Sequence, residues 1–159
     1  MIPLGILAAA GRGTVAPPTA TTWDSGAKGS EIVLTNGNMD AENPVGAWRS
    51  VYGTKGRSNG KFAYEIVFLA GAADKRPFAS LADKTNLSNV LGTYTGNNSF
   101  TTKESIGYWG HAYIYYNLTP GVSYVVAPQT AVNDIVTVAV DIDALEVSFY
   151  RNGTHVYTL

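Results

Sequence analysis

The stretch that most constrains the fold is residues 133–155, NDIVTVAVDIDALEVSFYRNGTH, in which two runs of alternating side chains are separated by short turns. In the second run, Leu145, Val147 and Phe149 share one face, and more polar residues lie between them. This period of two is typical of a strand with one buried and one solvated face. In the first run, residues 135–142, one face is entirely valine and isoleucine and the other is only partly polar. We therefore expect the first run to be the more central strand.

Each run is followed by residues that favour a reversal of the chain. Asp143-Ala144 predicts a turn between the two strands. Asn152-Gly153 predicts a second turn, because Asn and Gly tolerate the positive φ that a two-residue type I′ hairpin requires. The stretch therefore predicts an antiparallel meander of three strands.

Composition supports a single all-β domain. The chain has 159 residues, of which 45% are hydrophobic and 14% charged, enough for a real core. Ten Tyr, three Trp and seventeen Gly are typical of many strands joined by tight turns, and no long helical periodicity is present. A net charge of −1 gives no electrostatic footprint for nucleic acid or an anionic membrane. The absence of Cys excludes disulfides, thiolate chemistry and Cys-based zinc sites.

Residues 1–22 differ from the rest of the chain. Residues 1–10 are apolar, and residues 11–22 form a linker rich in Gly, Pro and Thr. A secretory signal is a poor fit because Pro3 and Gly5 interrupt the apolar run and no Lys or Arg precedes it. No membrane-spanning helix fits this run or any other part of the chain. We expect an arm that buries its large apolar side chains on a partner; these are Ile2, Leu4, Ile6 and Leu7.

Shorter alternating runs predict four more strands, at residues 31–35, 47–52, 61–69 and 123–127. Asn36-Gly37 marks a turn leading from the first of these strands to the second. In the third strand, the large apolar residues lie opposite Lys61 and Glu65, and we expect this strand to be central to a sheet. Its apolar face consists of Phe62, Tyr64, Ile66 and Phe68.

The middle of the chain is less regular. Residues 70–103 predict loops around one short strand at residues 90–94, with a helical turn near Leu81. Residues 105–116, SIGYWGHAYIYY, are dense in aromatic side chains. They predict a strand on each side of Gly110.

Three blocks of residues resemble the SPRY domain, in the version found on bacteriophage structural proteins. The first runs from Trp23 through EIVLTNGNM to AWRSVYGTKGRSNGKFAYEI. The second is LGTY followed by IGYWG, and the third and most specific is DIVTVAVDIDALEVSFYRNG. Together they span residues 23–153.

The resemblance implies an antiparallel two-sheet β-sandwich of the concanavalin A-like jelly-roll type, which we place at residues 23–159 behind the arm and linker of residues 1–22. SPRY domains bind peptides and proteins through variable loops. They also usually continue for further strands after this Asn-Gly, so we expect an open sheet edge near Leu159. The arm, or a strand from a neighbouring subunit, could pair with that edge.

Catalytic patterns are absent from the sequence. No GxSxG elbow, P-loop, HExxH or Rossmann glycine pattern occurs, and the only imidazoles are those of His111 and His155. Asp141 and Asp143 lie two apart on or beside a strand, a spacing that could suggest a cation or a carboxylate pair, but a turn and structural hydrogen bonds explain them better. Glu65 is expected to pair with a polar neighbour or face water. We expect no catalytic residue, no metal and no cofactor.

Aromatic side chains are the strongest candidates for a binding site. The resemblance places Trp23, Trp48, Phe62 and Tyr64 in the core. The aromatic block around Gly110 holds more rings than one buried strand face accommodates, so some must be exposed, either as an interaction surface or as ordinary sheet surface. The candidate ligand or interface residues are Tyr108, Trp109, His111, Tyr113 and Tyr115.

The sequence therefore predicts a non-enzymatic bacteriophage virion protein, a tail, fibre or appendage component. Its arm would attach it to other virion proteins in a homo-oligomer or larger assembly, and its domain would recognise a host-surface glycan or protein. Two alternatives stay open. One is a purely structural role as a capsid decoration protein or tail adaptor. The other is a carbohydrate-active enzyme using Glu65 or Asp141, since concanavalin-like sandwiches also include glycosidases.

Overall fold

The computed structural model describes residues 21–45, 49–69, 78–82, 105–116 and 123–159. The predictions for the arm side chains, for Trp48 and for a strand at residues 90–94 lie outside these ranges. All the regular structure in the described residues is antiparallel β-strand.

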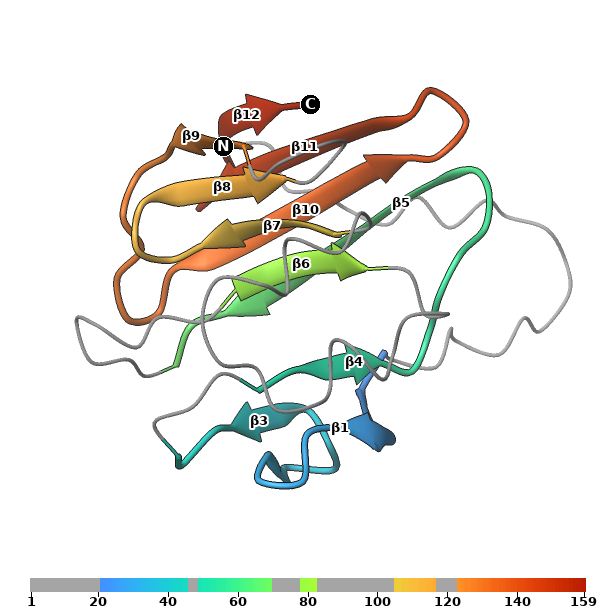
Figure 1. The fold of residues 1–159 in the computed structure, drawn as a ribbon, viewed down its shortest axis with the longest axis vertical. Coiled ribbons are helices and arrows are strands. Elements are labelled where there is room, and N and C mark those ends of the chain that lie inside the picture. Colours follow the sequence, from blue (N-terminus) through green and yellow to red (C-terminus); the bar gives the residue numbers. More distant parts are fainter. Residues whose placement is uncertain (1–20, 46–48, 70–77, 83–104, 117–122) are drawn as a thin grey trace, which may run out of the picture.

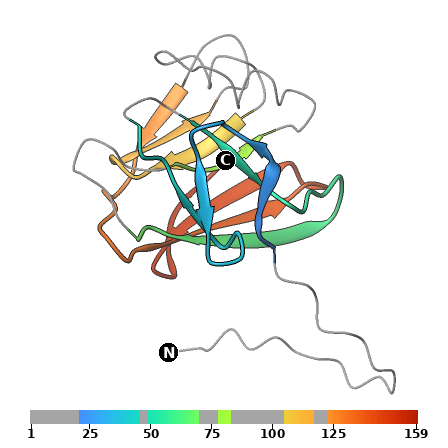
Figure 2. The ribbon, with the colours of Figure 1, turned by 90° about the horizontal axis from the view of Figure 1, so that it is seen from below.

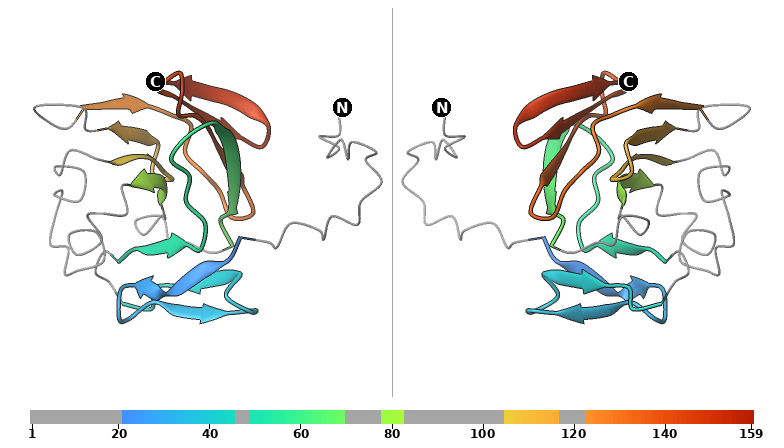
Figure 3. Two further views of the ribbon diagram at one scale, coloured as in Figure 1. Left: turned by 90° about the vertical axis from the view of Figure 1, so that its right-hand side faces the viewer. Right: turned by 90° about the vertical axis from the view of Figure 1, so that its left-hand side faces the viewer.

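Two four-stranded antiparallel sheets face each other and form a β-sandwich (Figures 1 and 3). The first sheet has the order β12-β11-β10-β5 and the second has the order β6-β7-β8-β9. The predicted all-β, two-sheet antiparallel fold is therefore confirmed. The strands of the first sheet are β5 (Lys61–Val67), β10 (Ile135–Asp141), β11 (Glu146–Arg151) and β12 (Thr154–Thr158). Those of the second are β6 (Phe78–Ala82), β7 (Ser105–Trp109), β8 (Tyr113–Tyr116) and β9 (Ser123–Val126).

Two small two-stranded sheets, β1-β4 and β2-β3, lie at one end of the sandwich, the end from which Figure 2 is viewed. The turn at Asn36-Gly37 forms as predicted, with φ of 51° and 63°. It leads from β2 into β3, a strand that the sequence did not predict. The strand expected at residues 31–35 is shorter in the structure. Of the strand expected at residues 47–52, the structure describes only residues 49–52, and β4 begins at Val51. The bounds are β1 (Trp23–Lys28), β2 (Val33–Thr35), β3 (Asp40–Glu42) and β4 (Val51–Gly53).

The meander β10-β11-β12 is confirmed. Asn152 and Gly153, with φ of 50° and 76°, close the second turn as a two-residue hairpin. The first turn is longer than expected, because Asp141 pairs directly with Glu146. Leu145 lies in that turn with φ of 57° and is 86% exposed, so the prediction that it belongs to the buried face is wrong.

Two other strand predictions need correction. β10 is central as expected, but β5 pairs only with β10 among the described residues and is an edge strand. Alternation of side chains indicates which face of a strand is buried, but not how many strands pair with it. The apolar face of β5 therefore did not establish a central position, although its opposite face carries Lys61 and Glu65. Leu81 lies in a strand and pairs with Ile106, so the expected helical turn is also wrong.

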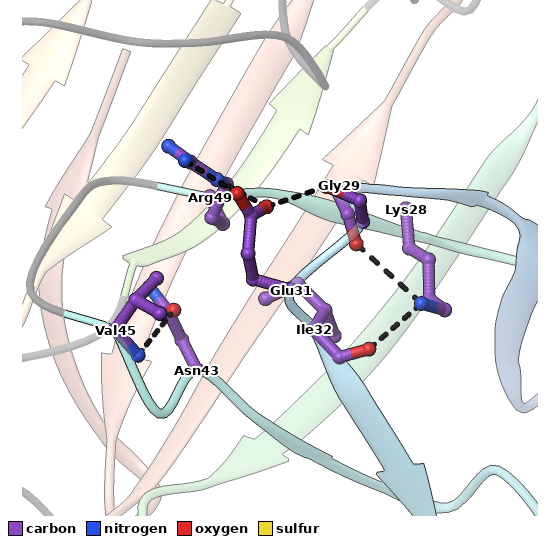
Figure 4. A network of polar contacts seen from close by, with 8 residues as sticks. Lys28, Gly29, Glu31, Ile32, Asn43, Val45 and Arg49 are labelled. Carbon is purple, nitrogen blue, oxygen red and sulfur yellow. Dashed lines mark hydrogen bonds and ion pairs between the residues drawn. The ribbon is translucent and has the colours of Figure 1, made fainter.

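A bidentate ion pair lies beside the small sheets (Figure 4). Arg49 donates from Nε and Nη2 to the Glu31 carboxylate at 2.6 and 2.8 Å. The hydrogen bond from Arg49, with a smaller contribution from Ser30, lowers the pKa of Glu31 to about 2. Nearby, the Lys28 ammonium donates to the carbonyl of Ile32 at 2.7 Å. The loop after β1 is therefore tied to the segment that leads into β4.

The core lies between the two sheets and includes residues from both. The Tyr108 ring meets the Phe149 ring edge-on at a centroid distance of 6.3 Å, and both side chains are fully buried. The Tyr108 hydroxyl donates to the carbonyl of Pro128, and burial raises its pKa to about 12. Tyr64 of β5 donates to the carbonyl of Ser80 in β6 at 2.7 Å, which links the sheets by a hydrogen bond. Of the residues placed in the core by resemblance, Phe62 and Tyr64 pack against this cluster, whereas Trp23 is half-buried in β1.

A buried carboxylate organises the start of β10. Asp134 is 7% exposed and accepts hydrogen bonds from the Ala131 amide, Arg151 Nε and Asn152 Nδ2 at 2.6 to 2.7 Å. These bonds, that of the amide above all, lower the pKa of Asp134 to about 2. Because Arg151 and Asn152 belong to the β11–β12 hairpin, one side chain connects the loop before β10 to that hairpin.

The Asp134→Asn variant should therefore lose about 2 kcal/mol of unfolding free energy at neutral pH, because an amide replaces the charged acceptor of these bonds. The folded pKa lies below the ordinary unfolded value near 4, so the wild type should lose this stabilisation as the pH falls from about 4 to about 2. Denaturant unfolding at pH 7 and pH 3 should show a smaller fall in unfolding free energy for the variant than for the wild type. The variant should keep part of the pH dependence, because the pKa of Glu31 is also lowered. Asp40→Asn, in the β2–β3 hairpin, controls for the change in charge; equal pH dependence in all three proteins would contradict the role of Asp134.

Candidate interaction surface

The β7–β8 hairpin confirms the predicted strand on each side of Gly110. Trp109 pairs with Tyr113 across a three-residue loop, and the Ala112 amide donates to the Trp109 carbonyl at 3.1 Å. Ala112 has φ of 86°, the left-handed conformation that a short hairpin loop of this length requires at its last position. The sharp reversal brings the side chains of the two aromatic strands beside one another.

Alternation along these strands divides their side chains between the two faces of the sheet. Tyr108 and Ile114 point inward and are fully buried. Trp109, Tyr113 and Tyr115 occupy the opposite phase and lie on the outer face, half-buried. The same backbone geometry that completes the core therefore places three large rings outside it.

The strand registers align these outer side chains in two rows across the sheet. One row contains Phe78, Trp109, Tyr113 and Val126, in the order β6 to β9. The other contains Ser80, Gly107, Tyr115 and Tyr124 in the same order. We call the apolar and aromatic members of these rows, with His111 of the loop, the aromatic face: Phe78, Trp109, His111, Tyr113, Tyr115, Tyr124 and Val126.

The rings of the aromatic face form one continuous network. Phe78 stacks on Trp109 with centroids 5.7 Å apart and an interplanar angle of 7°. Trp109 in turn contacts His111 at 4.9 Å and Tyr113 at 6.0 Å. Tyr124 meets Tyr113 at 5.3 Å in an edge-to-face arrangement. Each ring restricts the rotamers of its neighbours, so the surface is ordered before any partner binds.

Gly107 interrupts the second row where the backbones approach closely. A Cβ atom at this position would lie 2.7 Å from the Cβ of Ser80. Only glycine leaves enough room there for β6 and β7 to pair without displacement. The gap is spanned diagonally, because the Phe78 and Tyr115 rings approach to 6.1 Å.

The aromatic face is neutral, and its β9 side is open to solvent. Residues 105–133 contain no Lys, Arg, Asp or Glu. Tyr124 is 59% exposed and Val126 is 80% exposed. Burial, with smaller contributions from Tyr113 and Tyr124, raises the pKa of Tyr115, so its hydroxyl stays protonated at neutral pH. This combination of fixed rings and uncharged hydroxyls can pack against apolar groups and exchange hydrogen bonds with a partner.

The structure brings together four of the five predicted interface residues and separates the fifth. Trp109, His111, Tyr113 and Tyr115 share the aromatic face, but Tyr108 is a core residue that a partner cannot reach without opening the sandwich. The sequence analysis did not predict the other members of this surface, because only the pairing of β6 and β9 with the hairpin brings them beside it. The strand predicted at residues 123–127 was the one available signal. The missed members are Phe78, Tyr124 and Val126.

The candidate carboxylates have structural partners away from this surface. Glu65 accepts from the Thr137 hydroxyl at 3.0 Å. Asp141 pairs with Lys61 at 2.6 Å, which lowers the pKa of Asp141, and also accepts from the Ala144 amide. Asp143 accepts from the amide of Gly60 across the sheet end at 3.1 Å.

The second histidine also lies away from the aromatic face. His155 is exposed on β12, where its Nε2 is 2.8 Å from the Thr158 hydroxyl. In the ranges that the structure describes, no three His, Asp or Glu side chains gather as metal ligands would. The same ranges contain no helix that could span a membrane.

Comparison with known proteins identifies the fold. No family model matches the chain, and no curated protein matches it in sequence. Among solved structures, the SPRY domain of human HERC1 superposes with a TM-score of 0.64 at 16% sequence identity. The match covers 86% of this chain and 79% of that domain. At this identity the likeness establishes the fold, which is the one that the three sequence blocks indicate.

The β7–β8 loop provides a direct test of the hairpin that builds the surface. Ala112→Gly should raise the unfolding free energy by about 1 kcal/mol, because an L-residue with a Cβ is strained at this φ and glycine is not. Thermal unfolding should then shift upward by about 2–4 °C. Ala139→Gly, in the interior of β10, should lower stability instead. A destabilised Ala112→Gly variant would show that the loop conformation differs from the one described.

Proposed function

We propose that this chain, which has the SPRY fold, is a non-catalytic recognition protein of a bacteriophage virion, a component of the tail, a fibre or an appendage. Its N-terminal arm attaches it to other virion proteins. Its aromatic face binds a protein on the host surface. The phage type of the sequence resemblance supports the virion setting, and the protein and peptide ligands typical of the SPRY resemblance support the class of partner.

The observation that carries this proposal is the continuous aromatic face on an uncharged sheet. Tyrosine and tryptophan dominate the energetics of protein interfaces because they bury a large area with few rotatable bonds. The ring contacts within the face, from Phe78 through Trp109 to Tyr124, hold these side chains in place, so binding costs little side-chain entropy. Neutrality of the face favours a partner whose contacting surface is also apolar or uncharged.

A non-catalytic role is supported by the way the described carboxylates are used. Glu65 and Asp141, the acids that a glycosidase hypothesis would need, are engaged by Thr137 and Lys61 on the sheet opposite the aromatic face. Neither acid belongs to the surface that best fits ligand binding.

The purely structural alternative, a capsid decoration protein or tail adaptor, is favoured by one observation. β9 borders the aromatic face with exposed, uncharged side chains, a character that suits contact with another virion subunit. Copy number in the particle separates the two roles. Many copies on the head would indicate decoration, and a few at the tail tip would indicate adsorption.

The recognition role predicts that Tyr113→Ala combined with Tyr115→Ala weakens binding to host cells by a factor of about 30, since two interface anchors each contribute more than about 1 kcal/mol. Binding of the purified, labelled chain to cells measures this. Tyr150→Ala, a half-buried aromatic on the other sheet, is the matched control, and thermal unfolding verifies that all variants fold. Unchanged cell binding by the folded double variant would refute the aromatic face as the recognition surface. Loss of binding after deglycosylation of the cells, but not after proteolysis, would identify a glycan in place of a protein.

The attachment role of the arm predicts that a chain lacking residues 1–22 keeps its affinity for host cells but is not incorporated into particles. Incorporation is measured by the amount of the chain in purified particles from cells that supply it in place of the full-length protein. Incorporation equal to that of the full-length chain would exclude the arm as the attachment.

A further inference from the structure

Exposed sheet edges invite pairing with other strands, and most edges of this sandwich carry features that discourage it. β5 presents the charged side chains of Lys61 and Glu65. β12 is bulged, because its register with β11 shifts between Phe149 and Tyr150. In β6, the carbonyl of Ser80 is already occupied by the Tyr64 hydroxyl.

β9 has none of these protections. Its register with β8 is unbroken along its length, and within the described residues it pairs with β8 alone. No charged residue or proline lies in the strand. Tyr124 and Val126 expose large apolar side chains. A strand edge of this kind is suited to accept an additional strand.

The backbone of β9 also points the right groups outward. The Ala127 amide donates to the Ala112 carbonyl at 2.9 Å, so Ala127 directs its polar groups toward β8. Directions alternate along an antiparallel strand, and Val125 therefore also faces β8 while Tyr124 and Val126 face the open edge. Their N–H and C=O groups are the donors and acceptors that an added strand would use.

We propose that the strand added to β9 is the N-terminal arm of a second copy of this chain, residues 2–7, which gives the attachment role in the proposed function a molecular receptor. The arm matches the edge in chemistry, since residues 1–11 carry no charged side chain. Its apolar residues Ile2, Leu4 and Ile6 recur with the period of a strand.

Pro3 determines the phase in which the arm can pair. Proline has no N–H to donate, so Pro3 must direct its backbone away from β9. Ile2, Leu4 and Ile6 then direct theirs toward it, because backbone directions alternate along the added strand. The backbone N–H and C=O groups of Gly5 point away from β9, like those of Pro3.

This phase also places the apolar side chains of the arm where they are needed. Residues directly opposite each other in adjacent strands share a face of the sheet. In an antiparallel pairing, Leu4 and Ile6 therefore lie on the same face as Tyr124 and Val126 and pack against them at the β9 margin of the aromatic face. The phase that Pro3 requires for backbone pairing is therefore also the phase that buries the apolar side chains of the arm.

The position of the arm's attachment favours a second copy over the same chain. β1, which follows the linker, lies at the end of the sandwich opposite β9 (Figures 1 and 3). Pro17 and Pro18 in the linker favour extended backbone, which suits an arm that reaches a neighbouring copy.

Introduced thiols test this pairing directly, because the chain has no native cysteine. Full-length Leu4→Cys protein is mixed with Tyr124→Cys or with Val126→Cys protein under mild oxidation. We expect a disulfide-linked heterodimer with one of these partners, identified by peptide mapping, at least ten times faster than with Val67→Cys. Val67 is the matched control, since it is 46% exposed on β5, an edge strand of the opposite sheet. Equal rates with Val67→Cys would overturn the proposal, as would an intramolecular disulfide in the Leu4→Cys/Val126→Cys double variant without any heterodimer in the mixtures.

A second variant removes the acceptor edge without thiols. Val126→Pro eliminates an N–H that faces outward, so pairing with β8 is retained, and Val126→Thr keeps that N–H. Sedimentation should show assembled wild-type and Val126→Thr proteins and a monomeric Val126→Pro protein that still unfolds cooperatively. Assembly of a folded Val126→Pro variant would overturn the inference. If the Val126→Pro variant assembled while incorporation into particles still required residues 1–22, the proposed function would stand and the arm would bind a different receptor.

Discussion

The edge-to-face contact between Tyr108 and Phe149 joins the two sheets at the centre of the sandwich. Both side chains are fully buried, and the Tyr108 hydroxyl is satisfied by the Pro128 carbonyl, so the polar end of the ring carries no unpaired group into the core. Because side chains alternate along a strand, placing Tyr108 inward obliges Trp109 to lie outward. The core contact therefore determines the composition of the outer surface as well.

Polar interactions outside the core support this arrangement. Asp134 ties the loop before β10 to the β11–β12 hairpin, and the ion pair of Arg49 with Glu31 ties the loop after β1 to the segment before β4. None of these groups belongs to the aromatic face. These charged side chains thus lie outside the aromatic face, and the described strands β6 to β9 contain no charged residue.

Local patterns predicted much of the fold because they act within a few residues. The meander, the Asn152-Gly153 hairpin and the strand pair around Gly110 depend on alternation and on turn residues that tolerate positive φ, and all are present. The errors share one cause. Leu145 continues the alternation but lies in a turn, and β5 has a buried face but only one neighbour, and both facts depend on pairing with distant strands.

By itself the sequence determined the antiparallel class, the principal hairpins, the neutral aromatic block and the SPRY resemblance, because alternation, turn chemistry and motif are written in adjacent residues. It left open which aromatic residues are buried. Only the tertiary structure placed Tyr108 in the core, added Phe78 and Tyr124 to the outer rows and, within the residues it describes, left one side of β9 without a paired strand. The reason is physical: the period of two divides a strand into two faces, but the opposing sheet decides which face is buried, and strand register decides which side chains become neighbours.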